Sequence, residues 1–339
     1  MQQIDVIVVG GGMAGVACAS QLGQAGQSVM LIEKARGSGG RLSSKRIEGA
    51  EGECFGYDLG AVSFAASDTH FKRVLSQLQQ KGYAQQTPQG EWIGGERNSK
   101  LLRGLLEDVE TTFGRRVTRV SKCDAGWRVS AEDSADPSDQ VTLVAKRLVL
   151  AAPPVQAAAL VDFDADLSES LAAARLLPQW VVMIASRQSA SSPNAERLLE
   201  KLNEASEGAF SALSLESHKR QSASGRGSIW QLHYATDWSR RRVDVQPEAV
   251  RRHALAIWQE CAPDAESIAS HVHRWLYSVC GQTSCPNLTG EHQQRVADAC
   301  YYDAAQHFGL CGDYWLSNGA HNGVESAFLS GFNLAQRMI

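Results

Sequence analysis

Three glycines and an acidic residue near the N-terminus have the spacing of a dinucleotide-binding motif. Gly10, Gly12 and Gly15 follow the apolar run 4–9, and Glu33 stands 21 residues after Gly12. Glycines in this pattern permit a tight turn, close approach of the backbone to a pyrophosphate, and close packing of a helix on a sheet. The helix N-terminus favours phosphate charge, and Glu33 is suited to accept hydrogen bonds from ribose hydroxyls. The pattern predicts a dinucleotide site without distinguishing NAD from FAD.

A second glycine-rich segment could serve the same phosphates. Residues 36–41 read Arg-Gly-Ser-Gly-Gly-Arg. Gly39 and Gly40 would let the backbone pass close to a phosphate, and the Arg41 guanidinium could bind it through two parallel hydrogen bonds. A flexible basic surface loop is the alternative interpretation.

The middle of the chain carries aromatic and imidazole side chains that could line a substrate pocket. They are Trp230, His233, Tyr234, Trp238, Trp275 and Tyr277. Their alternation with other residues is equally typical of half-buried strands, so sheet core is the competing interpretation for each. His271 and His273 would share one face of a strand, but no third ligand is near in sequence, and we expect no metal site.

Hydrophobic periodicity indicates the elements that position these residues. The run 4–9, a helical pattern ending near Ala25, and the apolar run 29–32 form a strand–helix–strand unit of the size of a βαβ crossover. We therefore predict an α/β fold with a doubly wound sheet buried on both faces. β-like runs predict a meander beside this sheet, at 115–120, 127–130, 141–145 and 148–151. The segment 37–60, rich in glycine, serine and charge, predicts an extended loop.

A chain of 339 residues is expected to form about two domains. We predict a discontinuous dinucleotide-binding domain formed by residues 1–62, 100–165 and 278–339. A second, α+β substrate domain would comprise residues 63–99 and 166–277. The stretch 310–338 reads as a strand, a turn and a closing helix that returns to the first domain.

Composition excludes several functional classes. Lys plus Arg total 33 and Asp plus Glu total 37, a net charge of −4, which does not indicate a nucleic-acid partner. No window approaches the ~18 apolar residues of a membrane span, and the N-terminus lacks a basic region before its apolar run. The eight cysteines form no C-x-x-C pair, so we expect reduced thiols in a cytoplasmic protein.

Taken together, several motifs resemble the flavin amine oxidase superfamily. They are 10–15, Glu33, Gly39-Gly40-Arg41 and Asp58-Leu59-Gly60-Ala61. The segments 38–46, 273–277 and Cys311-Gly312-Asp313 look most like the bacterial renalases. The resemblance implies a two-domain fold in which non-covalent FAD lies along the first domain. Covalent attachment in related enzymes uses a C-terminal cysteine, whereas residues 317–321 here read Ser-Asn-Gly-Ala-His.

The resemblance also implies where the parts of FAD lie. The adenine end would lie near Glu33 and Val117, the pyrophosphate near Gly12, and the flavin ring near 60–63. Gly323 would open a helix pointing at the flavin, where its N-terminus stabilises the negative charge of the reduced ring. The implied cofactor-binding residues are Gly10, Gly12, Met13, Ala14, Gly15, Glu33, Lys34, Gly40, Arg41, Gly60, Ala61, Val62, Ser63, Val117, Gly312, Asp313, Gly323, Val324 and Ala327.

The activity implied by the resemblance is FAD-dependent oxidation of a dihydropyridine, an isomeric form of NAD(P)H, with molecular oxygen as acceptor and hydrogen peroxide as product. Such hydride transfer needs orientation and no general base, so the flavin itself would be the catalytic group. Candidate substrate-pocket residues are Trp275, Tyr277, His233 and Trp230. The alternatives are an amine or polyamine oxidase of the same fold, and an FAD-binding protein without turnover. Expected partners are a small-molecule substrate and oxygen, with neither nucleic acid nor membrane.

Overall fold

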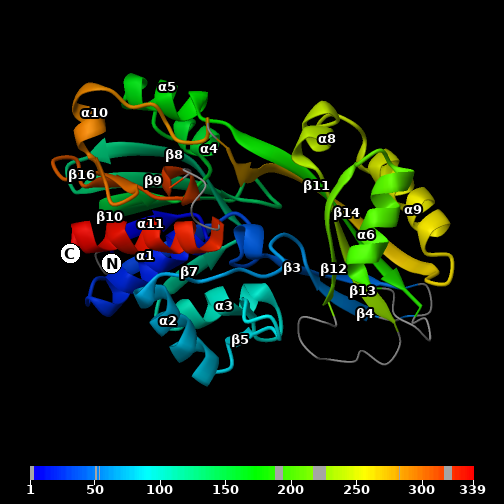
Figure 1. Cartoon of the computed structure of the whole chain (residues 1–339). Coiled ribbons are helices and arrows are strands. Elements are labelled where there is room, and N and C mark those ends of the chain that lie inside the picture. The colour runs from blue at the N-terminus through cyan, green and yellow to red at the C-terminus, as the bar shows by residue number, and fades with distance from the viewer. Residues whose placement is uncertain are drawn as a thin grey trace.

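A nine-stranded sheet forms the centre of the larger of two lobes (Figure 1). The computed structural model describes residues 4–49, 52, 54–187, 194–216, 227–281, 283–316 and 323–339. The main path of the sheet runs through β15 (Val296–Ala297), β16 (Cys300–Asp303), β17 (Phe308–Leu310), β10 (Gln140–Leu150), β1 (Ile4–Val9), β2 (Val29–Glu33) and β7 (Glu110–Phe113). From β17 to β7 each neighbouring pair is parallel, so the predicted doubly wound α/β sheet is confirmed.

The predicted meander is continuous with this sheet. The runs 141–145 and 148–151 were predicted as two strands but belong to the single strand β10. Its first half pairs antiparallel with β9 (Gly126–Asp133), which pairs with β8 (Arg115–Cys123), and its second half pairs in parallel with β1. Exposed and half-buried residues alternate in the first half, whereas Leu148–Leu150 are buried. Only the second half is covered on both faces, which explains the change of pattern.

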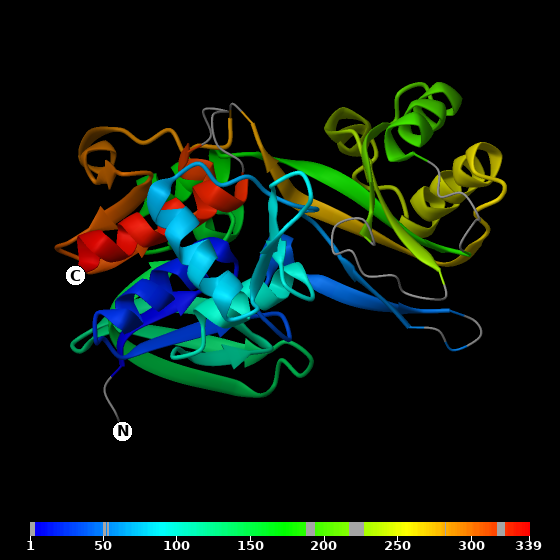
Figure 2. The same ribbon diagram turned by 60° about the horizontal axis from the view of Figure 1, so that its bottom comes forward.

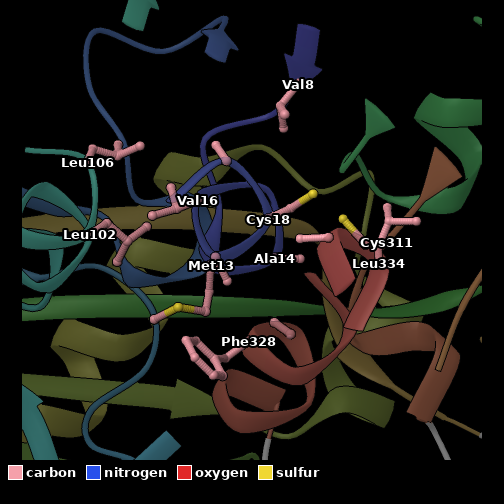
Figure 3. Packing of buried hydrophobic residues seen from close by; sticks show 14 of the residues in the cluster. Val8, Met13, Ala14, Val16, Cys18, Leu102, Leu106, Cys311, Phe328 and Leu334 are labelled. Atoms are coloured by element: carbon pink, nitrogen blue, oxygen red, sulfur yellow. The ribbon is translucent and has the colours of Figure 1, made fainter. Parts of the chain in front are cut away.

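Helix α1 (Met13–Gln24) packs between two other helices (Figure 3). Its Val16 points toward Leu102 of α3 (Asn98–Leu105), while Ala14 lies beside Leu334 of α11 (Gly323–Met338). All of these side chains belong to one buried apolar cluster on the α1 face of the sheet. The C-terminal helix therefore packs directly on the first helix of the chain.

Most of the other elements of this lobe are short. They are η1 (Gly40–Leu42), α2 (Thr69–Gln80), β5 (Ala84–Gln86), β6 (Trp92–Gly94), α4 (Pro154–Ala158), α5 (Ala165–Ala173), α10 (Gly290–Gln294) and η2 (Asp313–Leu316). Phe64, Phe71 and Trp92 lie in the same apolar cluster as α1. This packing places part of the segment 63–99, which was predicted to belong to the second domain, beside α1. The domain boundaries themselves stay a prediction.

A four-stranded antiparallel sheet forms the second lobe (Figure 1). Its spatial order is β12 (Phe210–Leu215), β13 (Ser228–Tyr234), β11 (Leu176–Ser186) and β14 (Ser267–Cys280). One face is covered by the helices α6 (Ala195–Ala205), α8 (Thr236–Arg241) and α9 (Pro247–Cys261). Aromatic side chains such as Trp180 and Trp258 fill the space between.

The segment 37–60 is not the extended loop that its composition predicted. It contains an antiparallel ribbon of β3 (Ser44–Glu48) and β4 (Cys54–Asp58), which reaches from the first lobe along the second (Figure 2). Charged residues on β3 concealed the alternation that places Ile47 and Phe55 on one face. That face packs on the sheet surface opposite the helices, against Val181 and Met183. Burial of this apolar face outweighs the loop-like composition.

Among the described residues, no helix combines the length and the apolar composition that crossing a bilayer requires.

The crossing of α1 and α11 provides a test of this packing. A Cβ atom on Gly331 would overlap the carbonyl oxygen of Ala14, whereas the nearest atom to a Cβ on Gly23 is 3.7 Å away. We expect Gly331→Ala to lower the free energy of unfolding by about 1–3 kcal/mol through overpacking. Gly23→Ala, in a helix with room, should raise it by up to ~1 kcal/mol. Urea unfolding measures both, and equal effects of the two substitutions would contradict the close crossing.

Candidate cofactor and substrate site

The three motif glycines meet different requirements. Gly10 has φ of 114°, and a Cβ there would lie 2.8 Å from the carbonyl oxygen of Ala151. A Cβ on Gly15 would overlap the carbonyl oxygen of Gly10. Gly12, by contrast, has no atom within 4 Å of its Cβ position, and it begins α1 without a side-chain cap. The first N–H groups of a helix have no intrahelical partners, so Gly12 forms an open cradle that suits a phosphate.

Glu33 lies beside this cradle. Its carboxylate accepts a hydrogen bond of 2.6 Å from the Gly11 N–H and one of 2.7 Å from the Ala35 N–H. A carboxylate has about four acceptor sites, so these two bonds leave capacity for a ligand hydroxyl. The position agrees with the sequence pattern, while binding of ribose stays a prediction.

The second glycine segment lies over the first. The Gly39 N–H donates to the carbonyl oxygen of Gly11 at 2.9 Å, and the Cα of Gly12 lies 3.3 Å from the Cβ position of Gly40. The hydroxyl of Ser38 is buried and has no hydrogen-bond partner among the described residues. Buried hydroxyls normally have partners. An unpartnered donor next to an open glycine cradle fits the phosphate groups of a dinucleotide.

Arg41 and Asp313 form a bidentate ion pair, with hydrogen bonds of 2.6 and 2.7 Å. The Asp313 carboxylate is buried, and the Arg41 side chain is 33% exposed. Arg41 also donates to the carbonyl oxygen of Ser278, and the Cys280 thiol donates to Asp313. Burial, and then the Asp313 charge, raise the pKa of Cys280 to about 12, so this thiol stays protonated and serves as a donor. The pair joins three distant parts of the chain.

The first turn of α11 lies beside this pair. An Asp313 carboxylate oxygen is 3.4 Å from the Cβ position of Gly323. The buried Glu325 side chain accepts hydrogen bonds from the Ser67 N–H, at 2.6 Å, and from the Asp68 N–H, at 2.7 Å. Val324 and Ala327 are buried. The segment 317–321, whose lack of a cysteine led to the prediction of non-covalent FAD, lies outside the described residues.

Long-range hydrogen bonds fix the segment 59–62. The Gln231 side-chain amide donates to the carbonyl oxygen of Gly60 at 2.7 Å, and the Trp275 indole N–H donates to that of Leu59 at 3.2 Å. The Asn98 amide donates to the carbonyl oxygen of Ala61 at 2.7 Å. Gln231 and Asn98 are fully buried. Sequence reasoning missed both, because no local pattern marks partners that lie so far apart in the chain.

Asp58 anchors the same segment through the hydrogen bonds of its carboxylate. Its fully buried carboxylate accepts from the Ser44 hydroxyl and from the Asn98 N–H, both at 2.8 Å. Asp58 belongs to the motif 58–61, but no role for it was predicted from the sequence. The sequence did contain a signal for such a role, because an acidic residue at the end of an apolar strand is rarely buried without a partner.

The structure separates the candidate pocket residues. Alternation along β13 puts Gln231 and His233 on the face toward the ribbon, whereas Trp230 faces the helices. Trp230 packs 5.5 Å from Trp258, ring centre to ring centre, so the structure does not bring it to the site. Tyr234 also lies in this core, stacked on Trp238.

Trp275 is the candidate that contacts the predicted flavin segment. Its ring carbon Cζ2 lies 3.3 Å from the Cβ position of Gly60, and the His273 ring packs against it edge to face at 4.4 Å. Burial, and then the charge of Lys45, lower the pKa of His273 to about 4. Tyr277 instead packs against the apolar cluster of the larger sheet.

The remaining predicted cofactor residues have protein partners. Lys34 donates to the Gln156 side chain at 3.0 Å, and the Ser63 hydroxyl donates to Glu91 at 2.5 Å. Val117 is half-buried against the cluster of the larger sheet, and the Val62 carbonyl accepts from Asn98 at 3.4 Å. Their roles toward a cofactor stay predictions. The described residues contain no group of three or more histidine, cysteine or acidic side chains able to hold a metal ion.

Two protein families match the chain. Residues 8–78 match the family described as "NAD(P)-binding Rossmann-like domain". Residues 80–339 match the family described as "Flavin containing amine oxidoreductase". The second match covers well over half of the 339 residues.

Solved structures of similar fold cover the whole chain. A putative protoporphyrinogen oxidase from Exiguobacterium sp. 255-15 has a TM-score of 0.65 at 12% identity, covering 100% of this chain and 99% of its own. Cyclohexylamine oxidase from Brevibacterium oxydans IH-35A has a TM-score of 0.61 at 12% identity, with 99% of both chains covered. A triple mutant of putrescine oxidase has a TM-score of 0.60 at 13% identity, covering 99% of this chain and 98% of its own. At these identities the likeness shows the shared fold.

The open Cβ position of Gly12 gives a sharp test of the cradle. Because no protein atom lies within 4 Å of that position, Gly12→Ala should leave the stability of the flavin-free protein within about 0.5 kcal/mol of wild type. The added methyl group would occupy the space that a pyrophosphate needs, so we expect at least tenfold weaker flavin binding, measured by fluorescence titration. Gly23→Ala, near the other end of α1, is the control. Unchanged flavin affinity in Gly12→Ala would contradict the assignment.

Arg41→Ala tests the ion pair. The substitution strands the buried Asp313 carboxylate, which should cost about 3 kcal/mol of stability, and it removes a cation from the predicted phosphate site. We expect the purified variant to contain less flavin, measured as the ratio of flavin-band absorbance to protein absorbance. Arg115→Ala breaks the more exposed pair with Asp139 and should change stability little, without loss of colour. Full flavin content in Arg41→Ala would count against the site.

Proposed function

The chain belongs to the family of flavin containing amine oxidoreductases, and on that basis we propose that it oxidises a dihydropyridine, an isomeric form of NAD(P)H, with oxygen as the acceptor. The chain is an FAD-dependent oxidoreductase that acts on a small molecule. FAD, when bound, supplies the hydride acceptor and then reduces oxygen to hydrogen peroxide.

The residues present fit FAD along one continuous path. Gly12 and the N-terminus of α1 would hold the pyrophosphate, with Glu33 at the adenosine end. Gly40 packs on Gly12, and the next residue, Arg41, pairs with Asp313. Asp313 in turn lies close to Gly323, the first residue of α11, and the N-terminal N–H groups of this helix would favour negative charge on the reduced ring.

The contact between the neutral His273 ring and Trp275 carries the proposal for the substrate. With its lowered pKa of about 4, His273 is neutral at physiological pH, and it packs on Trp275. This aromatic pair suits a planar neutral ring, and neither of its two side chains supplies a counter-charge to a protonated amine. Trp275 would hold the ring in position, which is the main requirement of hydride transfer.

Amine oxidation is the second candidate. The family description names amines, and an indole face can bind a cation. In the contact described, the indole face of Trp275 is the group that would stabilise a cationic substrate, because neutral His273 supplies no charge.

Anaerobic titration of the purified yellow protein tests the proposal. We expect isomerised NADH to bleach the flavin band, while fresh NADH, putrescine and cyclohexylamine leave it unchanged. Admission of air should restore the colour and yield one hydrogen peroxide per substrate. Bleaching by an amine would replace the proposal with the second candidate.

Two tryptophan variants test where the substrate binds. Trp275→Phe should raise KM for the isomerised nucleotide several-fold, because it removes the indole hydrogen bond that fixes Leu59. Trp238→Phe, on α8 and packed against the core of the second lobe, should leave KM unchanged. Equal KM values in the two variants would contradict a substrate wall at Trp275.

A further inference from the structure

The inner face of the β3–β4 ribbon carries a cation and a phenol side by side. Lys45 pairs with Tyr57 in the strand register, so both side chains leave the same face, on which Ile47 and Phe55 are the next pair. This face packs on the second sheet. Lys45 is itself exposed, at the ribbon end near the segment 59–62.

Strand β14 brings imidazoles to the same place. The Tyr57 and His271 rings are 6.1 Å apart between centroids. His271, His273 and Trp275 follow at intervals of two residues and therefore share one face of β14. The row extends from Tyr57 to the Trp275 indole, which binds Leu59. Four residues of strand span about 13 Å, so a ligand that touches both ends has the length of a nucleotide rather than of a short amine.

Three polar groups in this cluster lack partners among the described residues. The Tyr57 hydroxyl and the Nε2 atom of His271 are buried without hydrogen bonds, and Lys45 takes part in no ion pair. Buried polar atoms in folded proteins nearly always have partners, so two such atoms beside an unpaired cation indicate a ligand.

The charges of the cluster favour an anion. Burial, and then the charge of Lys45, lower the pKa of His271, while burial raises that of Tyr57, so imidazole and phenol are uncharged. Lys45 thus supplies a positive charge to the cluster. Two nearby carboxylates are engaged elsewhere. Asp58 accepts from Ser44 on the opposite face of the ribbon, and Glu216 accepts from the Asp58 N–H.

We propose that Lys45, Tyr57 and His271 bind an anionic group of the substrate, a phosphate or a carboxylate, beside His271 in the row that leads to Trp275. The inference rests on the proposed function, because it assigns the reacting ring to Trp275 and the charged part of the same molecule to Lys45. Tyr57 donates a hydrogen bond, Lys45 compensates the charge, and His271 provides a further polar contact.

Calorimetric titration of the flavin-loaded protein at constant ionic strength tests the subsite directly. The probes are inorganic pyrophosphate and acetate, which separate phosphate from carboxylate recognition. We expect at least one of the two to bind wild type, with binding weakened at least tenfold in Lys45→Met and about threefold in Tyr57→Phe. Both substitutions keep the side-chain volume, so folding should be preserved.

Arg46→Met is the matched control. Arg46 is the next residue of β3, is exposed, and pairs with Gly56, so its side chain leaves the opposite face of the ribbon. Its loss should leave the affinity for the anion unchanged. Equal weakening in Arg46→Met and Lys45→Met, unchanged binding in Lys45→Met, or no binding of either probe to wild type would overturn the proposal.

These measurements need no turnover, so they separate the subsite from the proposed function. If anions bind in a Lys45-dependent way but isomerised NADH does not bleach the flavin, the anion site is retained and the proposed oxidation of a dihydropyridine is rejected. Bleaching by isomerised NADH with the same KM in wild type and Lys45→Met would retain the reaction and overturn the subsite.

Discussion

The bidentate contact between Arg41 and Asp313 is the interaction on which the arrangement of the site depends. Through its guanidinium Arg41 binds Asp313 and the carbonyl oxygen of Ser278, and through its own carbonyl oxygen it accepts the Ala61 N–H. One residue thus fixes the end of β14, the start of η2 and the segment 59–62 relative to the glycine turn. A buried carboxylate is costly without compensation, and the Cys280 thiol supplies a further hydrogen bond to Asp313.

Features set by local sequence were predictable. The glycine turn, α1 and β2 follow from periodicity and from residues whose backbone requirements are local, such as Gly10 with its positive φ. Arg41 and Asp313 were each expected near a cofactor, from motifs in separate parts of the chain. Their direct contact was not predicted, because nothing in either motif specifies that the two side chains pair across 272 positions.

Features set by tertiary packing were not predictable. The ribbon of β3 and β4 was missed because charged residues occupy its outer face. Phe55 is buried only because the ribbon packs on the second sheet. Trp230 and Trp275 both lie in runs with a strand-like pattern, yet one faces the helices and the other faces Gly60. A strand pattern alone does not say which of its two faces meets the site. Gln231, a polar residue in a fully buried strand, marks that face by its bond to Gly60.

The contact of the first helix with the last has a consequence for folding during synthesis. Helix α1 cannot bury its Ala14 surface until α11, roughly 300 residues later, leaves the ribosome, which at about 5–20 residues per second takes roughly 15–60 s. Strands β11 to β14 lie within one continuous stretch, 176–280, so the second sheet has all its strands available earlier. The nascent first lobe therefore exposes an apolar helix surface for most of translation, which makes it a natural client for chaperones.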